Sequence, residues 1–303
     1  MINPYKRLDV FKCKSLGHEK FENRVSVHHV MRIKNCYPQG CIYFLWRCHL
    51  LNKGQACIKG YQHVGRKCFG CKHYFDEKIN NQPLMLLSNE EYRQFLEELE
   101  EFEDWLESLN SKLIDIQGTI QTVKPALTKI ISHQSTHLNL NGYFIHFGDA
   151  FIDRTHWEDN CYAMVYPDQQ ERYQFAPDDQ IEFRARVELN QGRLIFKRLN
   201  SIDVLSRSQK STWTNSEALV ARTTTSSFAR QPQKCLHCDQ GVLVDVIDKS
   251  RPQWTRSREL FCLKSYPDPE FCFYLIEKKY LSETDQCPDD IDCSLSIERE
   301  VIT

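Results

Sequence analysis

The pattern of apolar and polar positions changes its period along the chain, and these changes divide the sequence into five segments. Residues 1–87 contain short apolar fragments broken by Cys, Gly, Lys and His, without a sustained period. Residues 88–117 carry apolar side chains three and four positions apart, and residues 118–206 alternate with a period of two. The first spacing predicts a helix and the second predicts strands. Residues 207–233 are polar and rich in Ser and Thr, which predicts a linker to a last segment, 234–303.

The predicted helix over 88–117 begins with Ser88-Asn-Glu-Glu91, which has the form of a capping box. Its apolar positions are Tyr92, Phe95, Leu99, Phe102, Leu106, Leu109 and Leu113, and Glu or Asp fills most of the others. This seam has heptad spacing, so it suits packing against the chain's own domains. Self-association or docking of a partner protein through the same acidic, amphipathic helix is the alternative.

Five strands are predicted between residues 118 and 206. They cover residues 118–128, 138–147, 161–166, 180–189 and 192–199. Asn190-Gln-Gly192 predicts a hairpin turn between the last two. From Ile181 to Val187 the apolar residues alternate with charged ones, so one face of this strand is expected to be buried. Five strands in about ninety residues predict a small closed barrel.

Two stretches carry resemblances to known families. Pro177-Asp-Asp-Gln-Ile-Glu-Phe-Arg-Ala-Arg-Val, followed by Gln191-Gly-Arg-Leu-Ile-Phe-Lys-Arg-Leu-Asn-Ser-Ile-Asp-Val-Leu205, resembles the last two strands of an OB-fold domain. That resemblance implies a barrel over 118–206 that binds single-stranded nucleic acid. Cys235-Leu-His-Cys238 and the strand that carries Cys262 resemble a zinc ribbon, in which two turns hold one ion.

The placement of the fourteen cysteines gives the first functional prediction. Seven lie in the first quarter of the chain and six in the last, with Cys161 between them. The opening residues contain no apolar core of a signal peptide, and no run is long enough to span a membrane, so we expect a cytoplasmic protein. Thiols are kept reduced in that compartment, which favours metal ligands over disulfides.

Ten cysteines are predicted to bind metal: Cys36, Cys41, Cys48, Cys57, Cys68, Cys71, Cys235, Cys238, Cys262 and Cys272. Further candidate ligands are Cys13, His18, His28, His29, His49, His63 and His73. Two or more zinc ions fit this inventory. An Fe–S cluster held by Cys36, Cys41, Cys48 and Cys57 is the alternative in the first segment. In the last segment the second pair departs from ribbon spacing, so Cys272, Cys287 and Cys293 all stay open as the fourth ligand.

Charge is strongly segregated although the formal net charge is only −2. Residues 1–87 contain fifteen Lys or Arg against five Asp or Glu, whereas residues 88–117 contain two against ten. A basic first segment suggests a polyanionic partner, or neutralisation by the acidic helix. The predicted nucleic-acid contacts are Arg184, Arg186, Arg193, Lys197, Tyr143, Tyr162, Arg66 and Lys67, which would meet phosphates or stack on bases.

Motifs of catalysis are missing from the sequence. It contains no phosphate-binding Gly-rich loop, no Gly-x-Ser-x-Gly and no His-Glu-x-x-His. We therefore expect a non-enzymatic α+β multidomain protein: an N-terminal Cys-rich metal-binding module, a long acidic helix, a five-stranded OB-like barrel and a C-terminal zinc-ribbon-like hairpin. Its predicted function is binding of single-stranded DNA or RNA. The alternatives are an Fe–S electron-transfer or cluster-sensing protein, and an assembly or adaptor protein.

Overall fold

The protein is described by a computed structural model that covers residues 1–15, 18–19, 22–228, 231–236, 238–250 and 254–274. The chain folds into two compact units, both of which are discontinuous in sequence. Unit 1 consists of Met1–Val123, Phe144–Val165 and Phe175–Thr212, and unit 2 consists of Lys124–Tyr143, Tyr166–Gln174 and the described residues from Trp213 onward.

Unit 1 begins with short helical segments and with three short strands that form one sheet. They are η1 (Pro4–Lys6), β1 (Phe11–Lys12), β2 (Arg24–Val25), the π-helix η3 (His28–Ile33) and β5 (Leu84–Met85). The strand order is β2-β1-β5, and both neighbours of β1 are antiparallel to it. Phe11, at the centre of this sheet, is fully buried.

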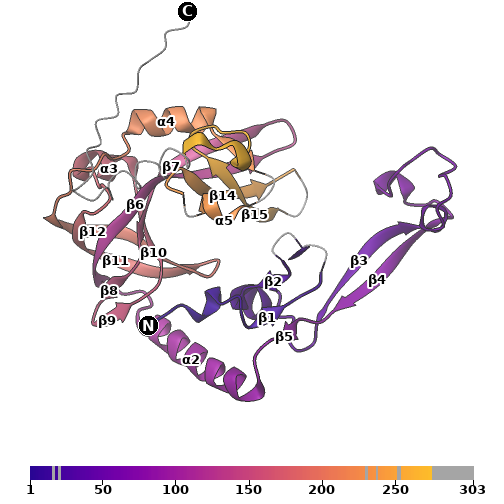
Figure 1. Ribbon diagram of the computed structural model, residues 1–303, viewed down its shortest axis with the longest axis horizontal. Coiled ribbons are helices and arrows are strands. Elements are labelled where there is room, and N and C mark those ends of the chain that lie inside the picture. The colour runs from indigo at the N-terminus through magenta and orange to yellow at the C-terminus, as the bar shows by residue number, and fades with distance from the viewer. Residues whose placement is uncertain (16–17, 20–21, 229–230, 237, 251–253, 275–303) are drawn as a thin grey trace, which may run out of the picture. The chain divides into compact units, whose positions relative to one another are not determined.

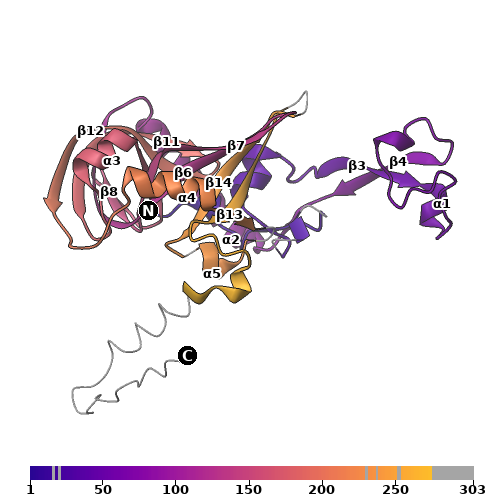
Figure 2. The ribbon, with the colours of Figure 1, turned by 90° about the horizontal axis from the view of Figure 1, so that it is seen from above.

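A long hairpin (residues 41–81) separates β2 from β5 in the sequence (Figure 1). Its strands are β3 (Cys41–Cys48) and β4 (Tyr74–Asn81), which pair antiparallel from Cys41 opposite Asn81 to Cys48 opposite Tyr74. The connection contains α1 (His49–Asn52), which directly follows β3 in Figure 2, and the 3-10 turn η4 (Arg66–Cys68). Cys48 is the only buried residue between 41 and 75, all of which are described.

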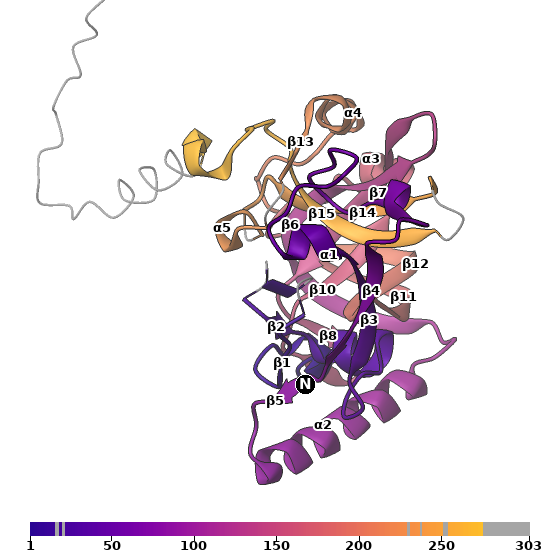
Figure 3. The same cartoon turned by 90° about the vertical axis from the view of Figure 1, so that its right-hand side faces the viewer.

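Helix α2 (Asn89–Ser108) is one unbroken helix (Figure 3). The Ser88 hydroxyl accepts a hydrogen bond from the Glu91 backbone N–H, and the Glu91 carboxylate accepts one from the Ser88 N–H, so the capping box is present. The helix ends at Ser108 rather than at residue 117. It ends there because the chain turns through Ser111, at φ +62°, and then enters strand β6.

The buried face of α2 packs inside unit 1. Phe95 and Phe102 are each 1% exposed, and Leu99 is buried beside them. The Phe102 ring meets Tyr5 edge to face at 5.6 Å and lies 5.9 Å from Trp157. Part of the heptad seam is therefore already covered by the chain's own side chains.

A large sheet follows α2, and residues 124–143, which include parts of its first two strands, belong to unit 2. The next strands are β6 (Ile114–Ile131), β7 (Thr136–Phe147), β8 (Ala150–Ile152), β9 (Thr155–Trp157), β10 (Cys161–Val165), β11 (Gln180–Asn190) and β12 (Arg193–Ser206). β11 pairs antiparallel with both β12 and β6, while β10 pairs parallel to β12. The expected alternation from Ile181 to Val187 is confirmed, because each apolar side chain is buried and each charged one is exposed. Phe147, Phe183 and Phe196 meet in the core with ring centroids 5.8 to 6.3 Å apart.

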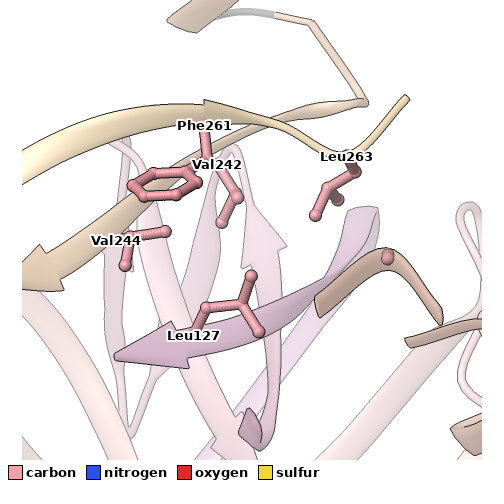
Figure 4. Packing of buried hydrophobic residues seen from close by; sticks show 6 residues of the cluster. Leu127, Val242, Val244, Phe261 and Leu263 are labelled. Carbon is pink, nitrogen blue, oxygen red and sulfur yellow. The ribbon is translucent and has the colours of Figure 1, made fainter. Parts of the chain in front are cut away.

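Unit 2 contains a second hairpin and most of the remaining helices. Its elements are α3 (Pro167–Tyr173), α4 (Asn215–Thr224), β13 (Ser226–Phe228), α5 (Gln233–Leu236), β14 (Gly241–Asp248), β15 (Thr255–Cys262) and η5 (Pro269–Phe271). The side chains of Leu127, Val242, Val244, Phe261 and Leu263 point toward one another and, with Ala221, form its core (Figure 4). Residues 128–131 of β6 extend the β14–β15 hairpin by pairing in parallel with β14.

The predicted arrangement of a separate five-stranded barrel over 118–206 and a separate ribbon hairpin is wrong. The strands of both segments belong to one mixed sheet of ten strands, in which β6 pairs with β14 and the order continues through β15 to β13. The cause is the length of β6. Its first residues, from Ile114 to Thr119, pair with β11, and its last residues pair with β14. An eighteen-residue strand has backbone donors and acceptors for both sets of neighbours.

None of the helices among the described residues has the length and apolar character that a bilayer crossing needs.

Removing the Phe102 ring tests the packing of α2 in unit 1. Phe102→Ala should lower the free energy of unfolding by about 3–5 kcal/mol, because a fully buried phenyl group is lost and its cavity is only partly refilled. The matched control is Leu96→Ala on the same helix, where Leu96 is 38% exposed and the expected change is below about 0.5 kcal/mol. Urea unfolding followed by tryptophan fluorescence measures both. Equal values for the two variants would contradict the described packing.

Candidate metal-binding pockets and nucleic-acid contacts

All twelve cysteines in the described part of the chain are free thiols. Two predicted ligand candidates, Cys287 and Cys293, lie outside the described residues. Eight of the twelve line two pockets, four in each unit. Cys161 lies apart from these pockets and is fully buried, and burial raises the pKa of its thiol, as expected for a cysteine that acts as a small apolar side chain.

The pocket in unit 2 contains Cys235, Cys238, Cys262 and Cys272. Cys235 and Cys238 come from α5 and the turn after it, Cys262 ends β15, and Cys272 follows η5. Burial raises the pKa of Cys235, and the charges of the other three thiols raise it further. The structure therefore brings four predicted ligands of this segment, Cys272 among them, to one pocket.

The turn after Cys235 is held by backbone and side-chain hydrogen bonds. The Gly241 N–H donates to the Cys238 carbonyl at 3.0 Å, and the Gln240 N–H donates to the Cys238 Sγ at 3.4 Å. Burial raises the pKa of Cys238, while the N–H groups of Gln240 and Gly241 act in the opposite direction. Lys124 donates from its Nζ to the carbonyls of Cys238 (2.7 Å) and Gly241 (2.9 Å). Lys124 has no signal in the sequence, since it lies more than a hundred residues from this turn.

The pocket in unit 1 lies in the connection of the long hairpin and contains Cys48, Cys57, Cys68 and Cys71. Cys48 ends β3, and Cys68 and Cys71 flank a turn in which the Cys71 N–H donates to the Cys68 carbonyl at 2.9 Å. The Cys57 Sγ accepts a hydrogen bond from the Lys59 N–H at 3.4 Å, and this and neighbouring backbone N–H groups lower the pKa of Cys57. His63 also lines this pocket.

Cys36 and Cys41 do not belong to either pocket. Cys41 and Cys48 occupy opposite ends of the eight-residue strand β3, which places their backbones roughly 23 Å apart at about 3.3 Å per residue. The six predicted ligands of the first segment therefore separate into four at one end of the strand and two at the other. The same separation applies to the set predicted for an Fe–S cluster. Cys36 and Cys41 lie at one end of β3, and Cys48 and Cys57 lie at the other.

Four thiols around one pocket offer the ligand number and type of a structural zinc site. Across the described residues, no three His, Cys, Asp or Glu side chains already converge as a finished ligand set. Metal binding at either pocket would thus have to draw the sulfur atoms together, which couples it to local folding.

The predicted nucleic-acid contacts on β11 and β12 are mostly engaged within the chain. Arg184 pairs with Asp115 at 3.0 Å, and Lys197 pairs with Glu188 at 2.5 Å. Arg186 is exposed on the same face of β11.

The two predicted tyrosines are differently placed. Tyr143 is completely buried, and its hydroxyl donates to the Asn215 side chain at 2.8 Å, so its ring has no surface for a base. Tyr162 is partly exposed, with the guanidinium of Arg193 at 5.6 Å from its ring centroid and the Lys6 ammonium at 5.8 Å. A base that stacks on Tyr162 would compete with these two cations.

Arg66 and Lys67 are the predicted contacts that lie in the long hairpin, and both are exposed beside the four-cysteine pocket. Near them the structure exposes large rings. Phe44 is 59% exposed, Trp46 is 44% exposed and Phe69 is 52% exposed. The Trp46 and Phe69 rings meet edge to face at 4.9 Å. Phe69 was missed in the sequence because it stands between two cysteines and reads as part of a metal-binding turn.

Comparisons with protein-family models, with curated proteins and with solved structures each gave no match.

Gly241 gives a test of the turn in unit 2. A Cβ added there would lie 1.8 Å from the Cys235 carbonyl oxygen, so the backbone would have to move. Gly241→Ala should therefore destabilise unit 2 by about 1–3 kcal/mol. The control is Gly65→Ala, since a Cβ at Gly65 meets nothing within 4 Å. Thermal unfolding followed by circular dichroism measures both, and an unchanged midpoint for Gly241→Ala would contradict the close approach.

Proposed function

We propose that this chain is a non-enzymatic, zinc-stabilised protein that binds single-stranded nucleic acid through its long hairpin. The observation that carries the proposal is the composition and exposure of residues 41–75. This stretch contains six Lys or Arg and no Asp or Glu, and it exposes three large aromatic rings. Cations that meet phosphates and rings that stack on bases are the two requirements of sequence-tolerant single-strand binding.

The cations of this stretch are available to a ligand. Arg47 pairs with Glu77 of the neighbouring strand at 2.7 Å. The other five are Lys53, Lys59, Arg66, Lys67 and Lys72, all of which are exposed. No ion pair found among the described residues involves these five side chains.

The aromatic side chains lie on the same hairpin. Phe44 and Trp46 are two positions apart on β3, so both project from one face of the strand, together with the exposed Ile42. Large apolar side chains on an exposed two-stranded sheet are costly in water unless a partner covers them. A partner that carries phosphates and flat bases fits both the charge and the rings.

Zinc supplies the order that this surface needs. The long hairpin has almost no buried apolar side chains, so four cysteines and an ion would replace a hydrophobic core. A site closed by four thiolates has no open coordination position, which suits a structural ion rather than a catalytic one. The four-cysteine pocket of unit 2 would stabilise the β14–β15 hairpin in the same way.

The metal part of the proposal predicts separate losses at the two pockets. Cys68→Ser and Cys262→Ser should each remove one zinc ion per chain, because three remaining thiols hold the ion far less tightly. Cys161→Ser is the matched control, since Cys161 lies in neither pocket and its replacement should leave the zinc content unchanged. Inductively coupled plasma mass spectrometry of the purified full chain measures the content. A brown, iron-containing protein would favour the Fe–S alternative instead.

The binding part predicts a loss of affinity when the exposed rings are removed. Phe44→Ala and Trp46→Ala should each weaken binding to a labelled single-stranded oligonucleotide by roughly 5- to 150-fold, equivalent to about 1–3 kcal/mol per stacked base. The matched control is Phe151→Ala, because Phe151 is 52% exposed on β8, outside the long hairpin. Fluorescence anisotropy measures all three, with single-stranded DNA, single-stranded RNA and duplex DNA compared.

The same titrations in a salt series separate the two candidate surfaces. Arg66→Ala combined with Lys67→Ala should reduce the slope of log affinity against log salt by about 1.4, or about 0.7 for each lost phosphate contact. Arg184→Ala combined with Lys197→Ala removes two cations that are already paired and should leave the slope unchanged. A reduced slope for Arg184→Ala with Lys197→Ala, and an unchanged slope for Arg66→Ala with Lys67→Ala, would assign binding to β11 and β12. No binding of any oligonucleotide at low salt would sink the proposed function.

A further inference from the structure

Three cysteines of unit 1, Cys13, Cys36 and Cys41, belong to neither four-cysteine pocket. Cys13 is 2% exposed and Cys36 is 4% exposed, and both are free thiols. Burial of isolated thiols needs no explanation, since cysteine packs well as a small apolar residue. Backbone hydrogen bonds and one ring contact, however, connect the loops that carry these cysteines with the loop that carries His18.

A tight loop brings Cys41 back to Cys36. The Gly40 N–H donates to the Cys36 carbonyl at 2.6 Å, and Gly40 has a φ of +84°. The positive φ turns the chain sharply just before β3 begins at Cys41. The Cys36 N–H donates in turn to the Val30 carbonyl of η3 at 3.0 Å, which fixes the start of the loop.

A second loop brings His18 to Cys13. The Cys13 N–H donates to the Asn23 carbonyl at 2.8 Å, and the Asn23 N–H donates to the His18 carbonyl at 3.1 Å. The backbone of Asn23 is thus bonded to both residues, so Cys13 and His18 are held on one loop.

The two loops meet. The rings of Phe11 and Tyr37, which stand two and one positions from Cys13 and Cys36, pack with centroids 5.0 Å apart. This ring contact makes the loop that carries Cys13 a neighbour of the loop that carries Cys36 and Cys41.

His18 is a candidate fourth ligand beside the three cysteines, because one of its ring nitrogens has no hydrogen-bond partner among the described residues. Its Nε2 lies 3.2 Å from the Nε2 of His29, with the two rings perpendicular. Its Nδ1 is buried and forms no hydrogen bond to any described residue. A metal-bound histidine typically uses one nitrogen for the ion and the other for a hydrogen bond.

We propose that Cys13, Cys36, Cys41 and the Nδ1 atom of His18 bind one zinc ion, in a site separate from the two four-cysteine pockets. Three thiols lose their protons to solvent on binding, and His29 holds the outer nitrogen of His18. Three sulfurs and one nitrogen are an ordinary ligand set for structural zinc. The ion would join the two loops at the base of the long hairpin. This inference does not depend on nucleic-acid binding.

The test is cadmium-113 NMR of the full chain after zinc has been exchanged for cadmium-113, because the chemical shift reports the numbers of sulfur and nitrogen ligands. We expect one resonance of a mixed sulfur–nitrogen site in addition to resonances of all-sulfur sites. His18→Gln should remove or shift the mixed resonance alone, and the control His133→Gln, at an exposed position, should change nothing.

The outcomes distinguish this inference from the proposed function. A wild-type spectrum with all-sulfur resonances only would overturn the third site and leave the two pockets intact. A mixed resonance without all-sulfur resonances would support the third site and count against the pockets. A mixed resonance that survives unshifted in His18→Gln would overturn the assignment to His18. If His18→Gln does not fold, the spectrum of Cys13→Ser decides the question, because that variant should lack the mixed resonance and keep the all-sulfur resonances. Native mass spectrometry of Cys13→Ser, with one bound ion fewer than wild type, gives an independent readout.

Discussion

The lack of a hydrophobic core between residues 41 and 75 is the constraint on which the functional part of this structure depends. Cys48 is the only buried side chain of this stretch, whereas a stable hairpin normally needs an apolar face packed against something. Ordering thirty or more residues costs on the order of 1–2 kcal/mol each in backbone entropy, and backbone hydrogen bonds return only part of that. On the function proposed above, a metal ion held by the four thiols of this pocket would supply stabilisation that the missing core does not.

Interactions that are local in sequence could be predicted, and those that depend on distant partners could not. The capping box at Ser88 and Glu91 is read from four residues, and the buried alternation from Ile181 to Val187 from seven. The end of α2 depends instead on β11, because Ile114 pairs with β11 as the first residue of β6 and so cannot continue the helix. Nothing near β6 in the sequence specifies that its last four residues pair with β14, more than a hundred residues later. The separate barrel was therefore the wrong architecture.

At the candidate site, too, the features that are local in sequence could be predicted and those that depend on distant residues could not. The two-residue spacers of Cys68/Cys71 and Cys235/Cys238 are local signals, and both pairs lie in pockets. The grouping of the other cysteines is set by where the chain returns, so the separation of Cys41 from Cys48 along β3 could not be read from spacing. Tyr143 shows the limit of reading aromatic residues on strands as ligand contacts. Its ring is buried because the alternation of β7 turns it inward, and only a structure says which face is inward.

Removing the metal should change nucleic-acid binding in opposite directions through the charge of the hairpin and through the order of its side chains. A chelation experiment can therefore separate these two effects. A zinc ion with four thiolates carries a net charge of −2, so the bound site reduces the formal +6 of residues 41–75 to +4. Thiolates that are released by chelation become neutral when they take up protons. Chelation therefore makes the stretch more positive, and electrostatics alone would then strengthen attraction to a polyanion. If nucleic-acid binding is lost on chelation, the cause must be loss of the arrangement of Trp46, Phe69 and the cations around them. The metal would then act by positioning this surface and not through its charge.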